Sequence, residues 1–524
     1  MPTALAFAGA ASTLCAMLDL RRVTLFVIPL AFAIGLATAQ TVLDAALVES
    51  LVRTAQERFG TKGLAVAVVQ DGEVLAEVAC GERATGSPMT TTSLCNIASC
   101  SKAFTAAAIA ILVQEGKLGW DDRVVDCVPE FRMADPWITA HMTVSDLLSH
   151  RCGLVTFAGD LLWYDSDYDD AEVLRRLEKL PITQRFREQF GYQNLMYMVA
   201  GIIVQRTSGM PWERFVEERF MAPLGMQNSR ASAQRLPPDA EKALPHIAGE
   251  PIPDHEFVAC KPAAAIYSSV HELTTWMRML LGGGKWNGVA LLSEASLREM
   301  WRPHVMTSGG SGALTNDFRS YGMGWFVSLE RGKKLVEHDG GMPGFLSKVS
   351  LMPAERFGFV VLNNTDDGVV NEAVKRALLA ARAGGDGKAE IERLAEVGKR
   401  IHAREKSAAE KRAAARQPDT KPSLALAAYA GRYEDAVYGP AAVTMTGDQL
   451  RVVLEPSKRR LFGTLSHWHH DTFRVDFPDK FLPFALVWFE LDHTGAVAGF
   501  RIDCPIADFD FGALDFRRQR PTER

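Results

Sequence analysis

Ser99 and Lys102 stand three residues apart, S-x-x-K, where an Ala-rich helix from Ser99 to about Glu115 is predicted to start. Residues i and i+3 of a helix share a face, so the lysine amine would lie beside the serine hydroxyl. That hydroxyl attacks efficiently only when a base takes its proton, and lysine is a base only when burial or a nearby cation lowers its pKa from about 10.4. The helix N-terminus would also present N–H groups near Ser99 to a developing oxyanion. Alone the motif is a weak signal, and a surface Ser/Lys pair is the alternative.

A second group, Tyr192-Gln193-Asn194, precedes a helix predicted to start near Leu195. A tyrosine at a loop-to-helix corner can point its oxygen into a cleft, share a proton with a lysine and pass it to a leaving group. Asn194 can hydrogen-bond a substrate amide. Taken by itself, Tyr192 is more typical of a packed aromatic side chain.

A third group, His338-Asp339-Gly340-Gly341, ends a predicted strand. Gly341 would let a substrate backbone approach and lend its N–H to an oxyanion hole. His338 would donate to substrate or help to position Tyr192, and Gly340 joins it as a candidate substrate-binding residue. The alternative is an ordinary turn.

In this order, the three groups are far more specific than any one of them. The chain resembles the superfamily of serine β-lactamases and penicillin-binding proteins over about residues 45–380. It is most similar to the class C β-lactamase-like group, which includes D-aminopeptidases and small esterases. The segments that carry the resemblance are 96–102, 147–154, 192–197, 266–269 and 338–345. The resemblance implies an α/β (α+β) serine hydrolase domain with an antiparallel sheet and a mostly helical subdomain.

The resemblance also implies the roles of the site residues. Ser99 would be the acylated nucleophile, Lys102 the general base and Tyr192 the acid/base of both half-reactions. The N–H groups of Ser99 and Gly341 would form the oxyanion hole. No metal and no cofactor is implied. One departure is that true β-lactamases of this group carry Lys-Thr-Gly where this chain has His338-Asp339-Gly340. His-x-Gly is frequent in the peptidases and esterases, which weakens a dedicated β-lactamase interpretation.

The flanking elements follow from local patterns. Asp71-Gly72 between two β-rich runs predicts a hairpin over 64–78. Runs at 323–329, 334–338, 346–352 and 357–362 predict antiparallel strands, and 370–382 a helix. We therefore expect a hydrolase domain over 40–383 and a charged, exposed helical linker over 384–422.

Residues 423–524 are expected to form a small all-β barrel or sandwich. Short β-rich runs at 442–445, 450–454, 473–477, 485–491 and 497–502 alternate there with turn signals. The segments 429–433 and 509–511 resemble the C-terminal β-domain appended to some of these hydrolases.

Arg21-Arg22, the apolar run 23–36 and Ala37-Thr38-Ala39 predict a signal peptide over residues 1–39, cleaved after Ala39. Met17 is a plausible true start, and an uncleaved membrane anchor is the alternative. Export would place the protein in the periplasm or outside the cell. The eight cysteines make neither a metal-type CxxC pair nor a dense disulfide framework. Loss of Cys15 with the signal leaves an odd number, so at least one thiol stays free.

Three further features are candidates of lower specificity. His467, His469 and His470 invite a metal interpretation, but no carboxylate or cysteine stands at ligand spacing. Trp163-Tyr164-Asp165 and the acidic stretch 165–170 are candidates for substrate contact. Cys100 adjoins the nucleophile but faces another side of the helix, so we expect it to pack.

Composition limits the classes of function. The 524 residues are 47% hydrophobic and 23% charged with a net charge of −5, which excludes a disordered chain and argues against nucleic-acid binding. We expect an exported serine hydrolase that acts through an acyl-enzyme on peptide or amide bonds. Linear or D-residue-containing peptides, such as linearised microcystin, lead the substrate classes. A carboxylesterase with weak β-lactamase activity and an inactive binding scaffold stay open as alternatives. The expected partner is a peptide or other small acyl substrate, with no stable membrane span after signal cleavage; homo-oligomerisation is left open.

Overall fold

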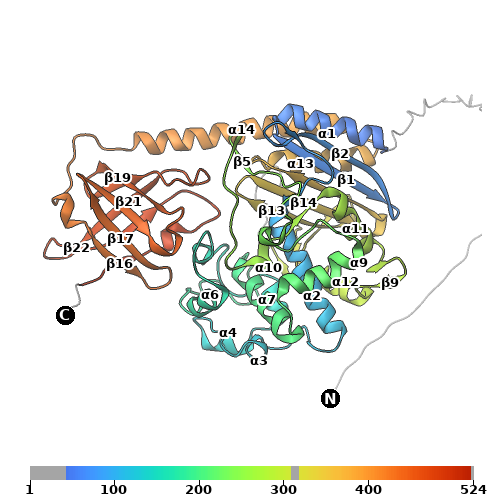
Figure 1. The fold of residues 1–524 in the computed structure, drawn as a ribbon, viewed down its shortest axis with the longest axis horizontal. Coiled ribbons are helices and arrows are strands. Elements are labelled where there is room, and N and C mark those ends of the chain that lie inside the picture. Colours follow the sequence, from blue (N-terminus) through green and yellow to red (C-terminus); the bar gives the residue numbers. More distant parts are fainter. Residues whose placement is uncertain (1–42, 308–317, 521–524) are drawn as a thin grey trace, which may run out of the picture. The chain divides into compact units, whose positions relative to one another are not determined.

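The computed structural model describes residues 43–307 and 318–520 (Figure 1). The expected signal peptide over residues 1–39 lies outside these described residues. Within the described ranges, every helix is too short or too polar to cross a membrane.

A nine-stranded antiparallel sheet organises the first part of the chain, in the order β10-β11-β12-β13-β14-β15-β1-β2-β3. Its hairpin β1–β2 turns at Asp71 and Gly72, both with positive φ, as the Asp-Gly pair predicted. The four strands predicted between 323 and 362 are present as β12 to β15. The bounds are β1 (Gly63–Gln70), β2 (Glu73–Ala84), β3 (Ser87–Pro88), β10 (Val305–Met306), β11 (Ser320–Tyr321), β12 (Phe326–Glu330), β13 (Lys333–Met342), β14 (Phe345–Met352) and β15 (Phe357–Asn363).

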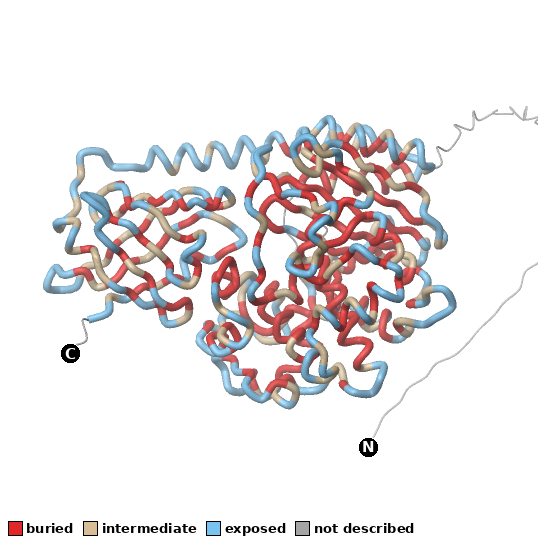
Figure 2. The backbone as a smooth tube through the Cα atoms, in the orientation of Figure 1, coloured by how far each residue is buried: buried red, intermediate tan, exposed pale blue. Residues whose placement is uncertain are grey.

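Because helices cover both faces of the central strands, the sequences of these strands are nearly continuous apolar runs. In β1, Leu64, Val66 and Val68 pack in one apolar cluster with α1 (Ala45–Phe59) and α13 (Val369–Arg382). The alternate residues Ala65 and Ala67 pack in a second cluster, which includes α11 (Val270–Leu281) and the helical subdomain. Figure 2 shows the buried backbone concentrated along these strands.

The helical subdomain contains α2 (Ser101–Gln114), which is buried over almost its entire length, packed against α7 (Asn194–Ser208). An all-round apolar helix of this kind belongs in a core. The remaining helices are α3 (Val124–Cys127), α4 (Pro136–His141), α5 (Val144–Leu148), α6 (Asp170–Leu177), α8 (Trp212–Val216), α9 (Ala222–Leu224), α10 (Lys261–Ala264) and α12 (Glu294–Met300). Short two-stranded ladders pair β4 (Cys95–Asn96) with β7 (Tyr267–Ser268), β5 (His246–Ile247) with β6 (Glu250–Pro251), and β8 (Lys285–Trp286) with β9 (Val289–Ala290).

Helix α14 (Gly387–Ala414) occupies most of the segment expected to be an exposed linker. Its first half is not a solvated spacer, because Ile391 and Leu394 are fully buried and the helix packs against α1 and α13. Its second half is exposed, as Figure 2 shows. The charge pattern alone did not show that the first half of α14 is partly buried and the second half exposed.

The C-terminal part is a closed eight-stranded barrel, β16 to β23. Five of its strands were predicted, whereas β16, β19 and β23 were not; β16 and β23 are short and β19 contains three polar residues in its last four. The bounds are β16 (Gly431–Asp435), β17 (Gly439–Thr446), β18 (Gln449–Leu454), β19 (Phe462–His469), β20 (Thr472–Val475), β21 (Ala485–Leu491), β22 (Val497–Asp503) and β23 (Phe516–Arg518).

The histidines of β19 and its turn are engaged locally. His467 Nε2 lies 3.0 Å from the backbone oxygen of His470, and His470 Nε2 lies 2.9 Å from Gln417 Oε1. The Nδ1 atom of His469 accepts from the Gln417 N–H. The seven described cysteines are unpaired, and six of them are buried.

Candidate active site

Ser99 lies in a single 3₁₀ turn, η1 (Ala98–Cys100), and the α-helix α2 begins two residues after it. The prediction that the helix starts at Ser99 was therefore slightly early. The preceding Ala98 has φ 46°, a left-handed conformation that a residue with a Cβ rarely adopts. Its N–H donates to Asn96 Oδ1 at 2.6 Å, which helps to hold the turn. Local strain of this kind is concentrated at functional sites, where the surrounding structure enforces it.

The Lys102 side chain is completely buried, and its amine makes three contacts. Nζ lies 3.0 Å from Ser99 Oγ, 2.7 Å from Asn194 Oδ1 and 3.0 Å from the Ala263 carbonyl oxygen. Burial lowers the pKa of Lys102 to about 7, although the nearby charge of Asp160 opposes this shift. A substantial fraction of the amine is therefore neutral near neutral pH.

The three partners determine where the lone pair of the neutral amine points. The oxygens of Asn194 and Ala263 accept hydrogen bonds only, so they take the two N–H bonds of the neutral amine. The lone pair is then left to the Ser99 hydroxyl, the partner that carries a proton to give. This is the arrangement that a general base for Ser99 requires.

Asn194 connects Lys102 to a buried carboxylate. Its Oδ1 accepts from Lys102, and its Nδ2 donates to Asp160 Oδ2 at 2.6 Å. One amide N–H of Asn194 therefore stays available for substrate, while the other orients the side chain. Burial raises the pKa of Asp160 to about 7, although the nearby Trp163 indole and the Asn194 hydrogen bond oppose this shift.

Tyr192 is buried directly before α7, with its ring centroid 4.8 Å from Lys102 Nζ. Burial raises the pKa of Tyr192 well above its ordinary value, and a hydrogen bond with Ser99 only partly opposes this. The resting tyrosine is therefore a protonated phenol. Such a group can donate a proton to a leaving group but does not compete with Lys102 as the base.

The third sequence group occupies the last part of β13, because the strand continues to Met342, beyond the predicted end at His338. The Nδ1 atom of His338 lies 2.6 Å from the Asp339 carbonyl oxygen, which can only accept, so the proton is on Nδ1. Nε2 then accepts from the Tyr321 hydroxyl at 2.9 Å. Burial and the charge of Lys102 lower the pKa of His338 to about 3. The ring is thus neutral and its two nitrogens are both occupied, which fits a positioning role better than donation to substrate.

The two glycines of this group differ in what surrounds them. A Cβ at Gly340 would lie under 3.0 Å from both the Ile97 carbonyl oxygen and the Ser347 hydroxyl, whereas one at Gly341 would meet only Leu346, at 3.5 Å. Gly340 therefore allows β13 to approach the turn that carries Ser99. Gly341, which the sequence predicted to let a substrate backbone approach, lines the open cavity.

Cys100 packs on the far side of the nucleophile turn. Its Sγ lies 3.3 Å from the His338 carbonyl oxygen and 3.2 Å from the Ser347 hydroxyl. Burial raises its pKa to about 12, so it is an inert thiol.

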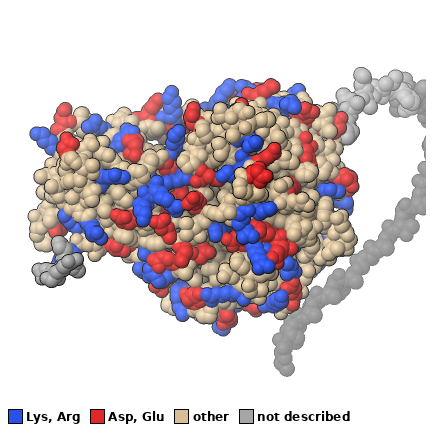
Figure 3. Space-filling model, viewed as in Figure 1, with Lys and Arg blue, Asp and Glu red and all other residues tan. Residues whose placement is uncertain are grey.

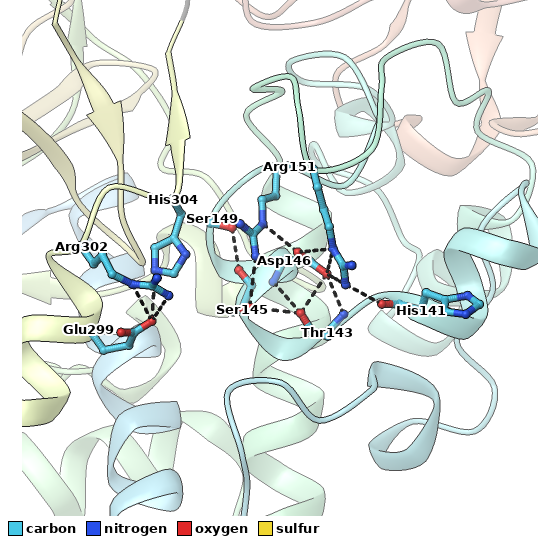
Figure 4. A network of polar contacts seen from close by, with 10 residues as sticks. His141, Thr143, Ser145, Asp146, Ser149, Arg151, Glu299, Arg302 and His304 are labelled. Atoms are coloured by element: carbon cyan, nitrogen blue, oxygen red, sulfur yellow. Dashed lines mark hydrogen bonds and ion pairs between the residues drawn. The ribbon is translucent and has the colours of Figure 1, made fainter. Parts of the chain in front are cut away.

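The loop that leads into Tyr192 is fixed by the buried carboxylate of Asp146, shown with its neighbours in Figure 4. Asp146 forms a capping box with Thr143 at the start of α5 and accepts from Arg151 Nε at 2.7 Å and Arg187 Nη2 at 2.8 Å. Burial favours the neutral acid, but the Arg187 hydrogen bond and the other donors hold the pKa of Asp146 below its ordinary value. This ion pair ties the 149–154 segment to the segment just before Tyr192.

A cavity of about 550 Å³ opens onto Ser99. The predicted residues Tyr192, Asn194, His338, Gly340 and Gly341 line it, while Lys102 lies beneath its floor, hydrogen-bonded to Ser99. The candidate contacts Trp163 and Tyr164 line it as well. Asp165 instead pairs with Arg460 at 2.6 Å and faces a different, smaller cavity.

Several cavity residues were missed in the sequence. Asp160, Arg319 and Phe326 carry no motif, and Phe481, Asp508 and Phe509 come from the C-terminal barrel. The resemblance had marked 509–511 as part of the appended domain, but no local signal connected that segment with the nucleophile.

Comparisons with known proteins agree with this architecture. The family described as "Beta-lactamase" matches residues 48–384, and a domain of unknown function, DUF3471, matches residues 415–520. The unguisins hydrolase ungD' of Aspergillus campestris is 26% identical over 333 residues, which are 60% of this chain and 60% of that protein. Penicillin-binding protein 4* of Bacillus subtilis is 25% identical over 346 residues, 61% of this chain and 71% of that protein. The match thus spans only about 60% of the length of the fungal relative.

Solved structures share the fold. The octameric penicillin-binding protein homologue from Pyrococcus abyssi aligns with a TM-score of 0.57 at 20% identity, covering 90% of this chain and all of that one. The D-amino acid amidase from Ochrobactrum anthropi in complex with L-phenylalanine amide aligns with a TM-score of 0.53 at 21% identity, covering 64% of this chain and 98% of that one.

A sheet flanked by α1 and α13, a helical subdomain and an S-x-x-K pair at their junction define a serine hydrolase of the type shared by β-lactamases and penicillin-binding proteins. The match over residues 48–384 places the chain in the β-lactamase family, with a DUF3471 barrel appended.

Proposed function

We propose that the protein is an exported serine hydrolase that cleaves peptide or amide bonds through an acyl-enzyme on Ser99. The observation that carries the proposal is the set of three contacts on the Lys102 amine, which leaves its lone pair to the Ser99 hydroxyl. Attack transfers the hydroxyl proton to Lys102 and forms a tetrahedral intermediate. Its C–N bond breaks as Tyr192 protonates the leaving amine, which leaves the Ser99 ester, and the Lys102 ammonium returns its proton to Tyr192. Water then attacks the ester, and the carboxylic acid leaves as Ser99 regains a proton. The backbone N–H groups of Ser99 and Gly341 are assigned to the oxyanion.

Linear or D-residue-containing peptides, including linearised microcystin, are the proposed substrates. The hydrolase name of the fungal relative supports cleavage chemistry rather than a binding scaffold. The cavity of about 550 Å³, with aromatic walls, accommodates a short peptide segment. His338-Asp339-Gly340 in place of Lys-Thr-Gly makes β-lactams secondary substrates. Export rests on the Arg21-Arg22 region, the apolar run and the Ala37-Thr38-Ala39 site.

A substrate panel and a nucleophile variant test this function. Purified protein is assayed with L- and D-peptides, L- and D-amino-acid p-nitroanilides, p-nitrophenyl esters and nitrocefin. We expect turnover of the amides, a fluorophosphonate adduct located on Ser99 by mass spectrometry, and a loss of at least about 10³-fold in Ser99→Ala. Preference for esters alone would favour the carboxylesterase alternative, and an adduct on another residue would refute the mechanism.

The scaffold alternative makes the opposite prediction. A binding protein of this fold would remain unlabelled by fluorophosphonate and would give equal, background rates before and after Ser99→Ala.

A further inference from the structure

The cavity above Ser99 has a different charge balance from the outer surface. On the face shown in Figure 3, basic and acidic side chains are interspersed. The cavity lining, in contrast, contains four carboxylates and one guanidinium: Asp160, Asp339, Asp366, Asp508 and Arg319.

Not all of these carboxylates are free to act on a ligand. Asp339 forms ion pairs with Lys348 and with Arg319. Asp366 is exposed and accepts a long hydrogen bond from the Ala248 N–H. Asp160 and Asp508 remain; among the residues that the structure describes, no cation forms an ion pair with either one.

Asp160 is 2% exposed, and only one of its oxygens is satisfied. Oδ2 accepts from Asn194, while Oδ1 is buried and has no hydrogen bond of good geometry within the described chain; the indole N–H of Trp163, which is also unpartnered, lies near the carboxylate. An unsatisfied buried carboxylate oxygen costs free energy unless a ligand or solvent serves it. Because this residue also lines the cavity, a donor on a bound ligand can reach it.

Asp508 comes from the barrel and adds a second negative charge near Asp160. Burial raises the pKa of Asp160, and the negative charge of the solvent-exposed Asp508 adds to that rise. A cation placed near both carboxylates is attracted by both charges, so the pair binds it more favourably than either carboxylate alone. A strongly hydrated anion would be repelled at the same place.

Aromatic rings surround this acidic end. The rings of Tyr164 and Phe509 are tilted by 44° and have a centroid distance of 4.2 Å across the junction between the two domains, and Trp163 and Phe481 also line the cavity. Tyr164 donates to Asp479 of the barrel at 2.7 Å, which holds this wall in place. Aromatic faces next to carboxylates favour ammonium groups over hydrated metal ions.

We propose that Asp160 and Asp508 form a subsite for a primary ammonium group of the substrate, close to the scissile bond. The barrel would thus take part in substrate selection by supplying one of the two carboxylates and part of the aromatic wall. This inference rests on the proposed function, because it names the substrate class of the same Ser99 site. The ammonium can be an α-amino terminus or a lysine-like side chain, and the test separates these sources.

The test compares kcat/KM for three p-nitroanilides: alanine with a free amine, N-acetyl-alanine, and N-acetyl-lysine. If the subsite binds a free α-amine, kcat/KM for the alanine substrate should exceed that for the N-acetyl-alanine substrate by a factor of at least about 10. If it binds a side-chain ammonium, kcat/KM for the N-acetyl-lysine substrate should exceed that for the N-acetyl-alanine substrate by the same factor. Both ratios near 1 in the unchanged protein would overturn the proposal.

Variants of the barrel carboxylate complete the test. Asp508→Asn is expected to lower the preferred ratio about tenfold, and Asp508→Lys to lower it further by reversing the charge. Asp448→Asn, at an exposed barrel turn, is the matched control and should leave the ratio unchanged. An unaltered ratio in both Asp508 variants would refute the subsite.

Fluorophosphonate labelling of Ser99 is measured on every variant, so that two kinds of failure are distinguished. Loss of labelling in the unchanged protein would contradict the proposed function as a whole. Normal labelling without amine preference would contradict the ammonium subsite alone.

Discussion

At the residue scale, the proposed mechanism makes the reactivity of Ser99 depend on the protonation of Lys102. Three of the site residues, Ser99, Lys102 and Tyr192, could be predicted from sequence because S-x-x-K places two groups on one helical face and the Tyr-x-Asn group precedes a helix. Asp160 could not be predicted, because its effect arises only when α7 brings Asn194 between it and Lys102. A single buried carboxylate leaves no periodic signal in a sequence.

A pH profile tests the base. Since Lys102 acts only when neutral, kcat/KM for a neutral substrate such as an N-acetylated ester should rise with pH, with an apparent pKa near 7. Because Asp160 also titrates near 7, the apparent value belongs to the pair. Asp160→Asn removes the negative charge that raises the pKa of Lys102, so the rising limb should move to lower pH. A flat profile, or a shift to higher pH, would contradict the assignment of Lys102 as the base.

At the scale of elements, the contact between β13 and the turn η1 builds the site. Gly340 lies against Ile97 and Ser347, and Cys100 fills the space beside them. The sequence indicated the strands and the hairpin at Asp71-Gly72 from local patterns. The approach of β13 to η1 joins residues some 240 positions apart, and nothing local distinguishes Gly340 from Gly341.

The two glycines provide a matched pair of variants. Gly340→Ala places a methyl group against the fixed backbone oxygen of Ile97, so we expect a loss of about 1–3 kcal/mol of stability and strongly reduced labelling of Ser99. Gly341→Ala keeps the backbone N–H and meets only Leu346, so it should fold normally and label with a small probe. Thermal unfolding and fluorophosphonate labelling check both. Equal behaviour of the two variants would show that β13 does not constrain the nucleophile turn.

At the scale of the whole molecule, the barrel and helix α14 have separate tasks. The first half of α14 completes the apolar cluster on one face of the sheet, through Ile391 and Leu394. The barrel meets the helical subdomain through Tyr164–Asp479 and Asp165–Arg460. Composition indicated a charged helix and a separate β-domain. It could not indicate that half of the helix is buried in the core, or that barrel residues line the cavity. Both features depend on contacts between segments that are distant in the sequence.

Two truncations separate these tasks. A chain that ends after Ala414 keeps α14 and should remain folded, with Ser99 still reactive toward a small fluorophosphonate, because Lys102, Tyr192 and Asn194 are all retained. It loses Phe481, Asp508 and Phe509, so the preference for amine-bearing substrates should disappear while the cavity becomes more open. A chain that ends after Arg382 also loses two fully buried side chains of α14, each contributing about 1.5–3 kcal/mol, and should unfold at a clearly lower temperature. Thermal unfolding, fluorophosphonate labelling and the kcat/KM ratios of amine-bearing to N-acetylated substrates are measured on both chains. If the longer chain folds but no longer labels, the barrel helps to build the nucleophile site itself, and its role extends beyond substrate selection.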